Sequence, residues 1–355
     1  MPYRGLSGAC ASILLALAAI SPALASPSVY TTAPDEPRAI TVKGVGDGRA
    51  DDSAAIQQAL DQARDTTGHG IVFLPSGRYR ITRTLVVPAG VRVYGVGATR
   101  PVILLAPNTP GFQQGVSTMI VFGGGDQYQV GKVPVPVPTI VPRDKIVRDA
   151  NSGTFYSAMS NVDIEIGEGN PAAAGVRFRM AQHAFLSHMD FRLGSAFAGV
   201  YQAGNVIENV HFQGGRYGIV TEKTSPAWQF TLLDSSFDGQ RDAAIREHEV
   251  DLTLVNVAIR NTPVGIEVDR GYSDSLWGKS QLHRHPQIVR WWYVDNTTME
   301  VGNAFGGPIY IGIEAGSTLG NFDITVSNAV KAPRYIHGET DIFQWQQQYR
   351  HDPAP

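Results

Sequence analysis

Three carboxylates and a histidine occupy matching places in short segments of similar sequence. Asp163 and Glu165 lie in NVDIE, Asp190 in HMDFR and His211 in NVHFQ. Alternate side chains of a strand lie roughly 6.6 Å apart on one face, and neighbouring strands lie about 4.8 Å apart. Inverting glycosidases hold two carboxyl groups roughly 6.5–9.5 Å apart with a water between them. The spacing predicts a catalytic strip of Asp163, Glu165, Asp190 and His211; the alternative is a solvated surface with ion pairs to Arg192.

The strip belongs to a repeat that begins near residue 159. Segments that mostly follow the pattern polar, Val or Met, polar, Ile or Phe begin at residues 161, 188, 209, 234 and 256, in steps of 27, 21, 25 and 22 residues. A second pattern, Gly-Val or a close variant, begins at residues 175, 199, 218, 244 and 265. Each unit is too short to bury its own apolar face, so the units must stack to share a core.

The period-two alternation within each unit indicates strands. We therefore predict an all-β protein, a right-handed parallel β-helix; a β-sandwich is the alternative, which two regular registers disfavour. In such a stack, equivalent positions form columns on the surface. One further column is predicted to contain Arg177, Tyr201, Val220, Arg246 and Glu267.

The N-terminal part of the chain is predicted to form the first turns of this stack and the segments that precede them. Residues 26–39 are proline-rich and polar, which is typical of a linker or an extended arm. An Asp51-Asp52-Ser53 cluster precedes apolar positions with helical spacing, so residues 53–65 are predicted to form a helix. The β-helix domain is expected to span residues 40–355, with a long loop insertion at about 107–158.

The first 25 residues have the features of a signal peptide. Arg4 precedes the short apolar run Ile13–Ile20, and Ala23-Leu24-Ala25 forms an A-x-A cleavage site before Ser26. The run is too short for a stable membrane anchor. We expect a secreted or periplasmic protein with no membrane contact after cleavage. The single cysteine, Cys10, lies in this segment, so the mature protein would have no disulfide.

The composition excludes one class of partner. The formal net charge is −3 and the sequence pI is near 6.3. No basic stripe is present, so nucleic acid is not an expected partner. The hydrophobic content of 43% allows a core that needs no disulfides.

Two stretches resemble known families. GVGDGRADDSAAIQQALDQA, GIVFLPSGRYRIT and LVVPAGVRVYGVG resemble the entry of the pectate-lyase-like superfamily that includes the rhamnogalacturonase/epimerase-related proteins. This resemblance implies that the helix at residues 53–65 caps the N-terminal end of the stack. Residues 158–219 are similar to the first half of the two-β-helix exo-β-1,3-glucanases, through N-V-x-I, G-V-x-F-x-M-A-Q and V-x-F-x-G-G-x-Y-G-I. The chain has no second entry motif, so that family's full catalytic site does not carry over, and association with a second β-helix is a further expectation.

The glucanase resemblance implies sugar contacts. Gln182 matches the glutamine of M-A-Q, and Tyr201 and Gln202 follow one repeat further on. Trp277 lies in a polar run, where its indole could stack on a sugar ring; its alternative is a packing role. We predict that these four residues bind substrate.

The expected function is a metal-free glycoside hydrolase without cofactors that acts on a β-glucan or related polysaccharide. A non-catalytic glycan-binding or structural β-helix is the alternative. A calcium-dependent polysaccharide lyase is a third hypothesis, since the resemblance to pectate lyases would place Ca²⁺ among Asp163 and Asp190 with Arg179 and Arg192 nearby. No D-x-D-x-D loop supports it. At the other end of the chain, Phe343, Trp345 and Tyr349 are predicted to cap the stack.

Overall fold

The computed structural model describes residues 26–67, 70–124, 154–181, 183–221, 230–247, 252–268, 287–295, 297–302, 309–319 and 322–327. Several sequence-based predictions lie outside these residues. They are the signal peptide, Gln182, Trp277 and the C-terminal cap of Phe343, Trp345 and Tyr349.

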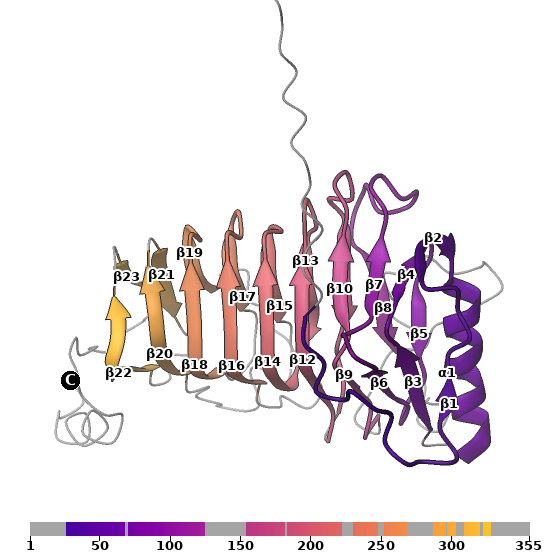
Figure 1. Ribbon diagram of the computed structural model, residues 1–355. Helices are drawn as coiled ribbons and strands as arrows, with labels where there is room; N and C mark the ends of the chain where they lie inside the picture. The colour runs from indigo at the N-terminus through magenta and orange to yellow at the C-terminus, as the bar shows by residue number, and fades with distance from the viewer. Residues whose placement is uncertain are drawn as a thin grey trace, which may run out of the picture.

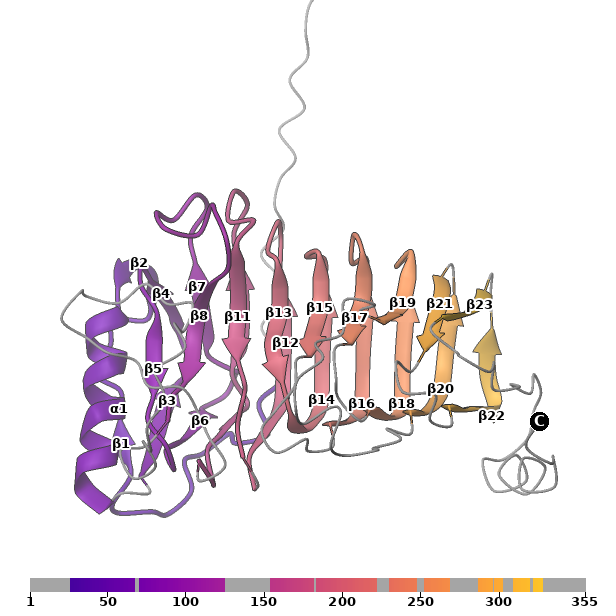
Figure 2. The same cartoon turned by 180° about the vertical axis from the view of Figure 1, so that it is seen from behind.

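The described strands form two long parallel sheets that run side by side along one axis (Figures 1 and 2). From β10 (Asp163–Ile166) onwards successive strands alternate between the sheets, so each turn adds one strand to each of them. In the earlier turns two strands of the first sheet, such as β6 (Arg92–Val96) and β7 (Val102–Leu105), precede one strand of the second. This confirms the predicted all-β, right-handed parallel β-helix. Coiling the chain in this way lets short strands share one interior.

The two sheets are built from strands of two to eleven residues. The first sheet contains β1 (Ile40–Thr41), β2 (Asp47–Asp51), β3 (Ile71–Pro75), β4 (Arg78–Ile81), β6 (Arg92–Val96), β7 (Val102–Leu105), β9 (Ala158–Ser160), β10 (Asp163–Ile166), β12 (Phe185–Arg192), β14 (Asn205–Gln213), β16 (Phe230–Asp238), β18 (Leu252–Arg260), β20 (Gln287–Asp295) and β22 (Ile309–Leu319). The second contains β5 (Leu85–Val87), β8 (Ser117–Phe122), β11 (Ala173–Arg177), β13 (Ala198–Ala203), β15 (Tyr217–Thr221), β17 (Ala243–Glu247), β19 (Val264–Val268), β21 (Thr297–Gly302) and β23 (Phe322–Ser327).

The first repeat marks a bend in the backbone at the same place in each turn. Its starting residues all have positive φ, between 48° and 61°: Asn161, His188, Asn209, Asp234 and Asn256. Asn and Asp tolerate this left-handed conformation better than other side chains. The polar residue that begins each unit is therefore explained by the positive φ that the backbone needs there. The sequence pattern shows the residue type but not this reason for it.

The second repeat begins with glycine because phenylalanine from the first sheet fills the space where a side chain would be. Phe191, Phe212 and Phe237 stack along the interior with ring centroids 4.9 Å apart in both pairs. A Cβ on Gly199 would lie 2.7 Å from the Phe212 ring, and one on Gly218 would lie 2.4 Å from the Phe237 ring. One turn further on the pairing changes, since Ala244 replaces glycine and Ile259 follows Phe237 in the column.

The N-terminal end of the stack is covered by α1 (Ser53–Thr67), close to the predicted bounds (Figure 1). Ile56, Leu60 and Ala63 of this helix are buried against the first turns. The two aspartates of the expected N-cap cluster bind different backbone amides. Asp51 accepts from the Ser53 amide at 3.0 Å, whereas Asp52 accepts from the amides of Val45 and Gly46 and so fixes the preceding turn.

Part of the range expected as a long loop insertion, residues 107–158, forms a strand. Residues 117–122 form β8, which pairs with both β5 and β11 in the second sheet. All six residues are buried. A strand buried on both faces has no alternation of apolar and polar residues, so the pattern that revealed the other strands was missing here.

We expect Gly218→Ala to destabilise the protein by about 1–3 kcal/mol, because the new methyl group would overlap the Phe237 ring. Adding Phe237→Ile to it copies the Ala244 and Ile259 combination of the next turn and should recover part of the loss. Urea unfolding of both variants measures this. An unchanged urea midpoint in Gly218→Ala alone would contradict the close contact between Gly218 and the Phe237 ring.

Candidate functional site

The predicted column of acidic residues and histidine forms on the first sheet. Ile164 pairs with Phe191 and Glu165 with Arg192, which sets Asp163 beside Asp190 on neighbouring strands. Asp190 then pairs with His211, and His211 with Ser236. The Asp190 amide donates to Asp163 Oδ1 at 3.0 Å.

Asp163 is buried, contrary to its expected position on an open surface. Its side chain is 1% exposed, and the side chain of Arg100, which lies over it, is 7% exposed. Arg100 Nε lies 3.2 Å from Asp163 Oδ1, and its Nη2 lies 2.9 Å from Asp190 Oδ2. Arg100 lies in the turn before β7. Its single guanidinium group forms ion pairs with two carboxylates on neighbouring strands.

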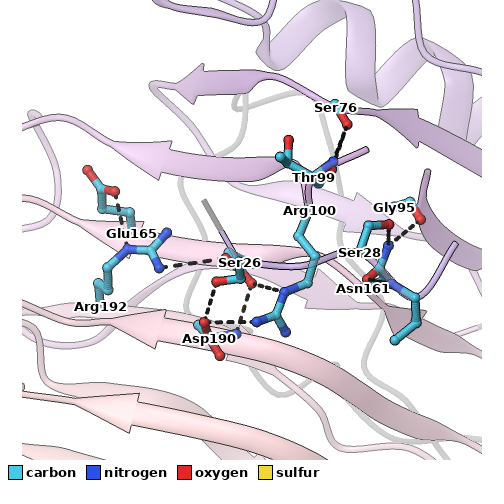
Figure 3. Close-up of polar contacts among 12 residues, drawn as sticks. Ser26, Ser28, Ser76, Gly95, Thr99, Arg100, Asn161, Glu165, Asp190 and Arg192 are labelled. Atoms are coloured by element: carbon cyan, nitrogen blue, oxygen red, sulfur yellow. Dashed lines mark hydrogen bonds and ion pairs between the residues drawn. The ribbon is translucent and has the colours of Figure 1, made fainter. Parts of the chain in front are cut away.

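The N-terminal arm, residues 26–39, explains the rest of the burial. It starts beside β12 and runs across β9 and β6 towards β1 (Figure 1). The Ser26 hydroxyl donates to Asp190 Oδ2, and the Val29 amide donates to Asn161 Oδ1 at 3.0 Å (Figure 3). Asn161 Nδ2 in turn donates to Ser28 Oγ and to the Gly95 carbonyl. The predicted extended arm is therefore attached to the strip that was predicted to be catalytic.

The surroundings of Asp163 shift the pKa of its carboxyl group. Loss of solvent raises the pKa of its carboxyl group, Arg100 opposes this rise, and Asp190 adds to it as a like charge. A raised pKa suits a general acid, but a general acid must also reach its substrate. In this arrangement Asp163 and Asp190 contact arginines and the arm instead.

Glu165 is the more accessible carboxylate of the group. Its side chain is 28% exposed, and Arg78 Nη2 lies 2.8 Å from one of its oxygens. On its other side Arg192 links it to Asp163, with Nε 3.5 Å from Glu165 and Nη1 3.6 Å from Asp163 (Figure 3). The ion pair to Arg192, the alternative given for this strip, is therefore present.

His211 lies on the exposed continuation of the strip. Its Nδ1 is 2.8 Å from Ser236 Oγ on the next strand. It is the neighbour of Asp190 across the sheet and extends the column away from the arm. The exposed His211 side chain is therefore more accessible than buried Asp163 and half-buried Asp190.

Tyr201 and Gln202, predicted to bind substrate, lie on β13 of the second sheet and not beside the carboxylates. Tyr201 belongs to the predicted column, since it pairs with Arg177 and with Val220. Arg177 Nε donates to Gln202 Oε1. The structure thus places Tyr201 and Gln202 on a different sheet from the four residues predicted to be catalytic.

Tyr201 is part of a cluster on the outer side of the second sheet, which we call the aromatic face and define by Phe197, Tyr201, Tyr217, Arg216 and Arg246. The Phe197 ring packs edge-on against Tyr201 at 6.0 Å and against Tyr217 at 5.6 Å. Arg216 and Arg246 lie over Tyr217, at 5.1 and 5.9 Å from the ring centroid. Tyr217 is buried, Phe197, Tyr201 and Arg246 are half-buried, and Arg216 is exposed.

The described residues contain no group of three or more His, Cys, Asp or Glu side chains arranged to hold a metal ion. Among the same residues no helix has the length and apolar character needed to cross a bilayer.

The family of the protein follows from comparison with known sequences. The family model described as rhamnogalacturonase A/epimerase, pectate lyase-like, matches residues 42–267, more than half of the chain. The protein belongs to this pectate-lyase-like family, as its N-terminal motifs predicted. The narrower likeness to two-β-helix exo-β-1,3-glucanases stays a prediction.

The similarity to curated relatives covers only a small part of each relative. TRPM8 channel-associated factor 2 of Bos taurus is 35% identical over 92 residues, which are 26% of this chain and 10% of the relative. The non-secreted LysM effector LysM19 of Penicillium expansum is 24% identical over 249 residues, 65% of this chain and 18% of the effector. The chain therefore spans a tenth to a fifth of the length of these relatives.

Two solved structures are similar in fold. PfbA, a surface adhesin of Streptococcus pneumoniae, aligns with a TM-score of 0.43 and 14% identity over 81% of this chain and 77% of PfbA. The A-module of a mannuronan C-5 epimerase from Azotobacter vinelandii aligns with a TM-score of 0.38 and 15% identity, over 83% of this chain and all of the module.

We expect Arg100→Met to lower the free energy of unfolding by about 3 kcal/mol at pH 7, because it leaves buried Asp163 and half-buried Asp190 without their shared cation. The folded-state pKa of Asp163 is already raised and should rise further in the variant. A raised carboxyl pKa gives stability that is greatest at low pH and is lost as the pH rises. The defect should therefore shrink towards pH 4.

Urea unfolding at pH 4, 5.5 and 7 measures this effect. Arg78→Met is the matched control, because its partner Glu165 is also a carboxylate of the strip but the pair is exposed. It should cost under about 1 kcal/mol. Equal losses in the two variants, or a loss in Arg100→Met that is independent of pH, would contradict a buried charge cluster.

Proposed function

We propose that this protein binds a polysaccharide along the aromatic face of its second sheet. The observation that carries the proposal is the set of aromatic and arginine side chains on, or directly before, the neighbouring strands β13, β15 and β17. Membership of a pectate-lyase-like family supports a polysaccharide as the ligand.

The aromatic face suits an extended glycan for geometric reasons. Half-buried Phe197 and Tyr201 give two partly accessible rings, and the buried Tyr217 ring of the next turn packs against Phe197 and supports it. The apolar C–H faces of sugars pack on such rings, while exposed Arg216 offers a fork of N–H donors to hydroxyl or carboxylate oxygens.

A metal-free glycoside hydrolase acting on a β-glucan is the second candidate. One observation favours it: partly exposed Glu165 lies next to Asp163, whose pKa is raised by burial, so the two carboxyls differ in environment. The arm and Arg100 cover Asp163 and Asp190, which weighs against this candidate. Binding is therefore the function that the geometry supports best.

The test is binding of the mature protein to a panel of glycans that includes laminarin and polygalacturonate, measured by calorimetry. Tyr201→Ala should weaken binding at least about tenfold, which is about 1.4 kcal/mol. His211→Ala, an accessible substitution on the other sheet, should bind as the wild type does. Thermal unfolding of both variants shows whether the fold is retained.

Two outcomes would contradict the binding proposal. One is glycan binding that is weakened by His211→Ala and unaffected by Tyr201→Ala. The other is release of sugars from laminarin, insensitive to EDTA and abolished by Glu165→Gln, which would establish the hydrolase in its place.

A further inference from the structure

The contact between Ser26 and the acidic strip has chemical features of a binding site. Besides its hydroxyl bond to Asp190, Ser26 accepts a bond from the Arg100 amide at 3.2 Å through its carbonyl oxygen. Ser26 is 8% exposed. Its backbone and its side chain are thus both held at the carboxylate pair.

The pair has acceptors that its neighbours do not use. Among the described residues, Asp163 Oδ2 and Asp190 Oδ1 are buried and accept no hydrogen bond. Arg192 Nη1 lies 3.6 Å from Asp163 Oδ2, within ion-pair distance but too far for a hydrogen bond. Buried polar atoms are nearly always hydrogen-bonded, so unused carboxylate oxygens point to a missing donor.

The predicted signal cleavage would create such a donor at this place. Hydrolysis of the Ala25–Ser26 bond adds the hydroxyl of water to the Ala25 carbonyl, leaving a carboxylate on the released peptide. The Ser26 nitrogen takes up protons and becomes an ammonium group. We propose that Asp163 and Asp190 form a binding site for this ammonium group, so that removal of the signal peptide completes the charge cluster.

The geometry permits the contact. Only Cα and Cβ separate the α-nitrogen from Oγ of the same serine, so the two atoms lie within roughly 4 Å of each other. Since Oγ is bonded to Asp190, the ammonium would lie at the edge of the carboxylate pair. A protonated amine has three donors, enough to reach both unused oxygens.

The charged groups that surround this point come from several elements. Asp190 and Arg192 lie on β12, Asp163 and Glu165 on β10, and Arg100 precedes β7. The other titratable groups nearby are Arg78, His188, His211, Tyr30 and Tyr94. Because so many groups surround the amine, its effect has to be measured between chains that share all of them.

Two chains that differ only at the N-terminus provide that comparison. One begins at Ser26. The other begins at Ala25, so its ammonium group lies one residue before Ser26 and the Ser26 nitrogen remains an amide. At pH 6.5 we expect the unfolding equilibrium constant of the Ser26 chain to be at least about tenfold smaller. An amine held by carboxylates has a raised pKa, so its stabilisation is present below about pH 7.7 and is lost as the pH rises through the folded-state pKa. The difference between the chains should therefore disappear towards pH 10.

Asp190→Asn in both chains should remove the difference at pH 6.5. If that variant does not fold, labelling of the Ser26 amine by an acylating reagent gives an independent result. The amine should react at least about tenfold more slowly in the folded Ser26 chain than in the same chain in urea. Equal stability of the two chains across this pH range, or equal labelling rates in the folded and unfolded chain, would overturn the proposal.

Discussion

The structure depends on one constraint: a parallel β-helix places the same position of successive turns about 4.8 Å apart. Every side chain therefore has to be compatible with its counterpart on the next turn. Inside, this favours stacked phenylalanines opposite glycines, as in Phe212 with Gly199. Outside, it sets Asp163 beside Asp190, where two like charges need a shared cation. Arg100 supplies that cation, and the arm covers what remains of the exposed edge.

The same constraint explains how much of the fold the sequence predicts. Because equivalent positions share an environment, their residue types repeat, and two registers of short motifs were enough to predict a β-helix and its surface columns. The helix at Ser53–Thr67 was predicted for a local reason, the apolar spacing of Ile56, Leu60 and Ala63. β8 was missed because all six of its residues are buried and show no alternation.

The candidate site was predicted only in part. The column of Asp163, Asp190 and His211 follows from the repeat, but its burial does not, because Arg100 and Ser26 lie outside the repeat. Nothing in their local sequence indicates that they meet Asp190, at a separation of 164 residues for Ser26. Likewise, Tyr201 and Asp190 each belong to a column, but only the three-dimensional order of strands shows that the columns lie on different sheets.

The central claim is that the Asp163–Asp190 pair is a covered charge cluster to which the N-terminal arm is bound. Amide hydrogen exchange at Val29 and Gly97 tests it most directly, since the Val29 N–H bonds Asn161 and the Gly97 N–H bonds the Tyr30 carbonyl. The account predicts that both amides exchange at least about a hundredfold more slowly than in an unfolded peptide, as expected for amides held in a closed structure. Exchange of both at the rate of an unfolded peptide would contradict it, because the arm would then be detached and the two carboxylates open to solvent.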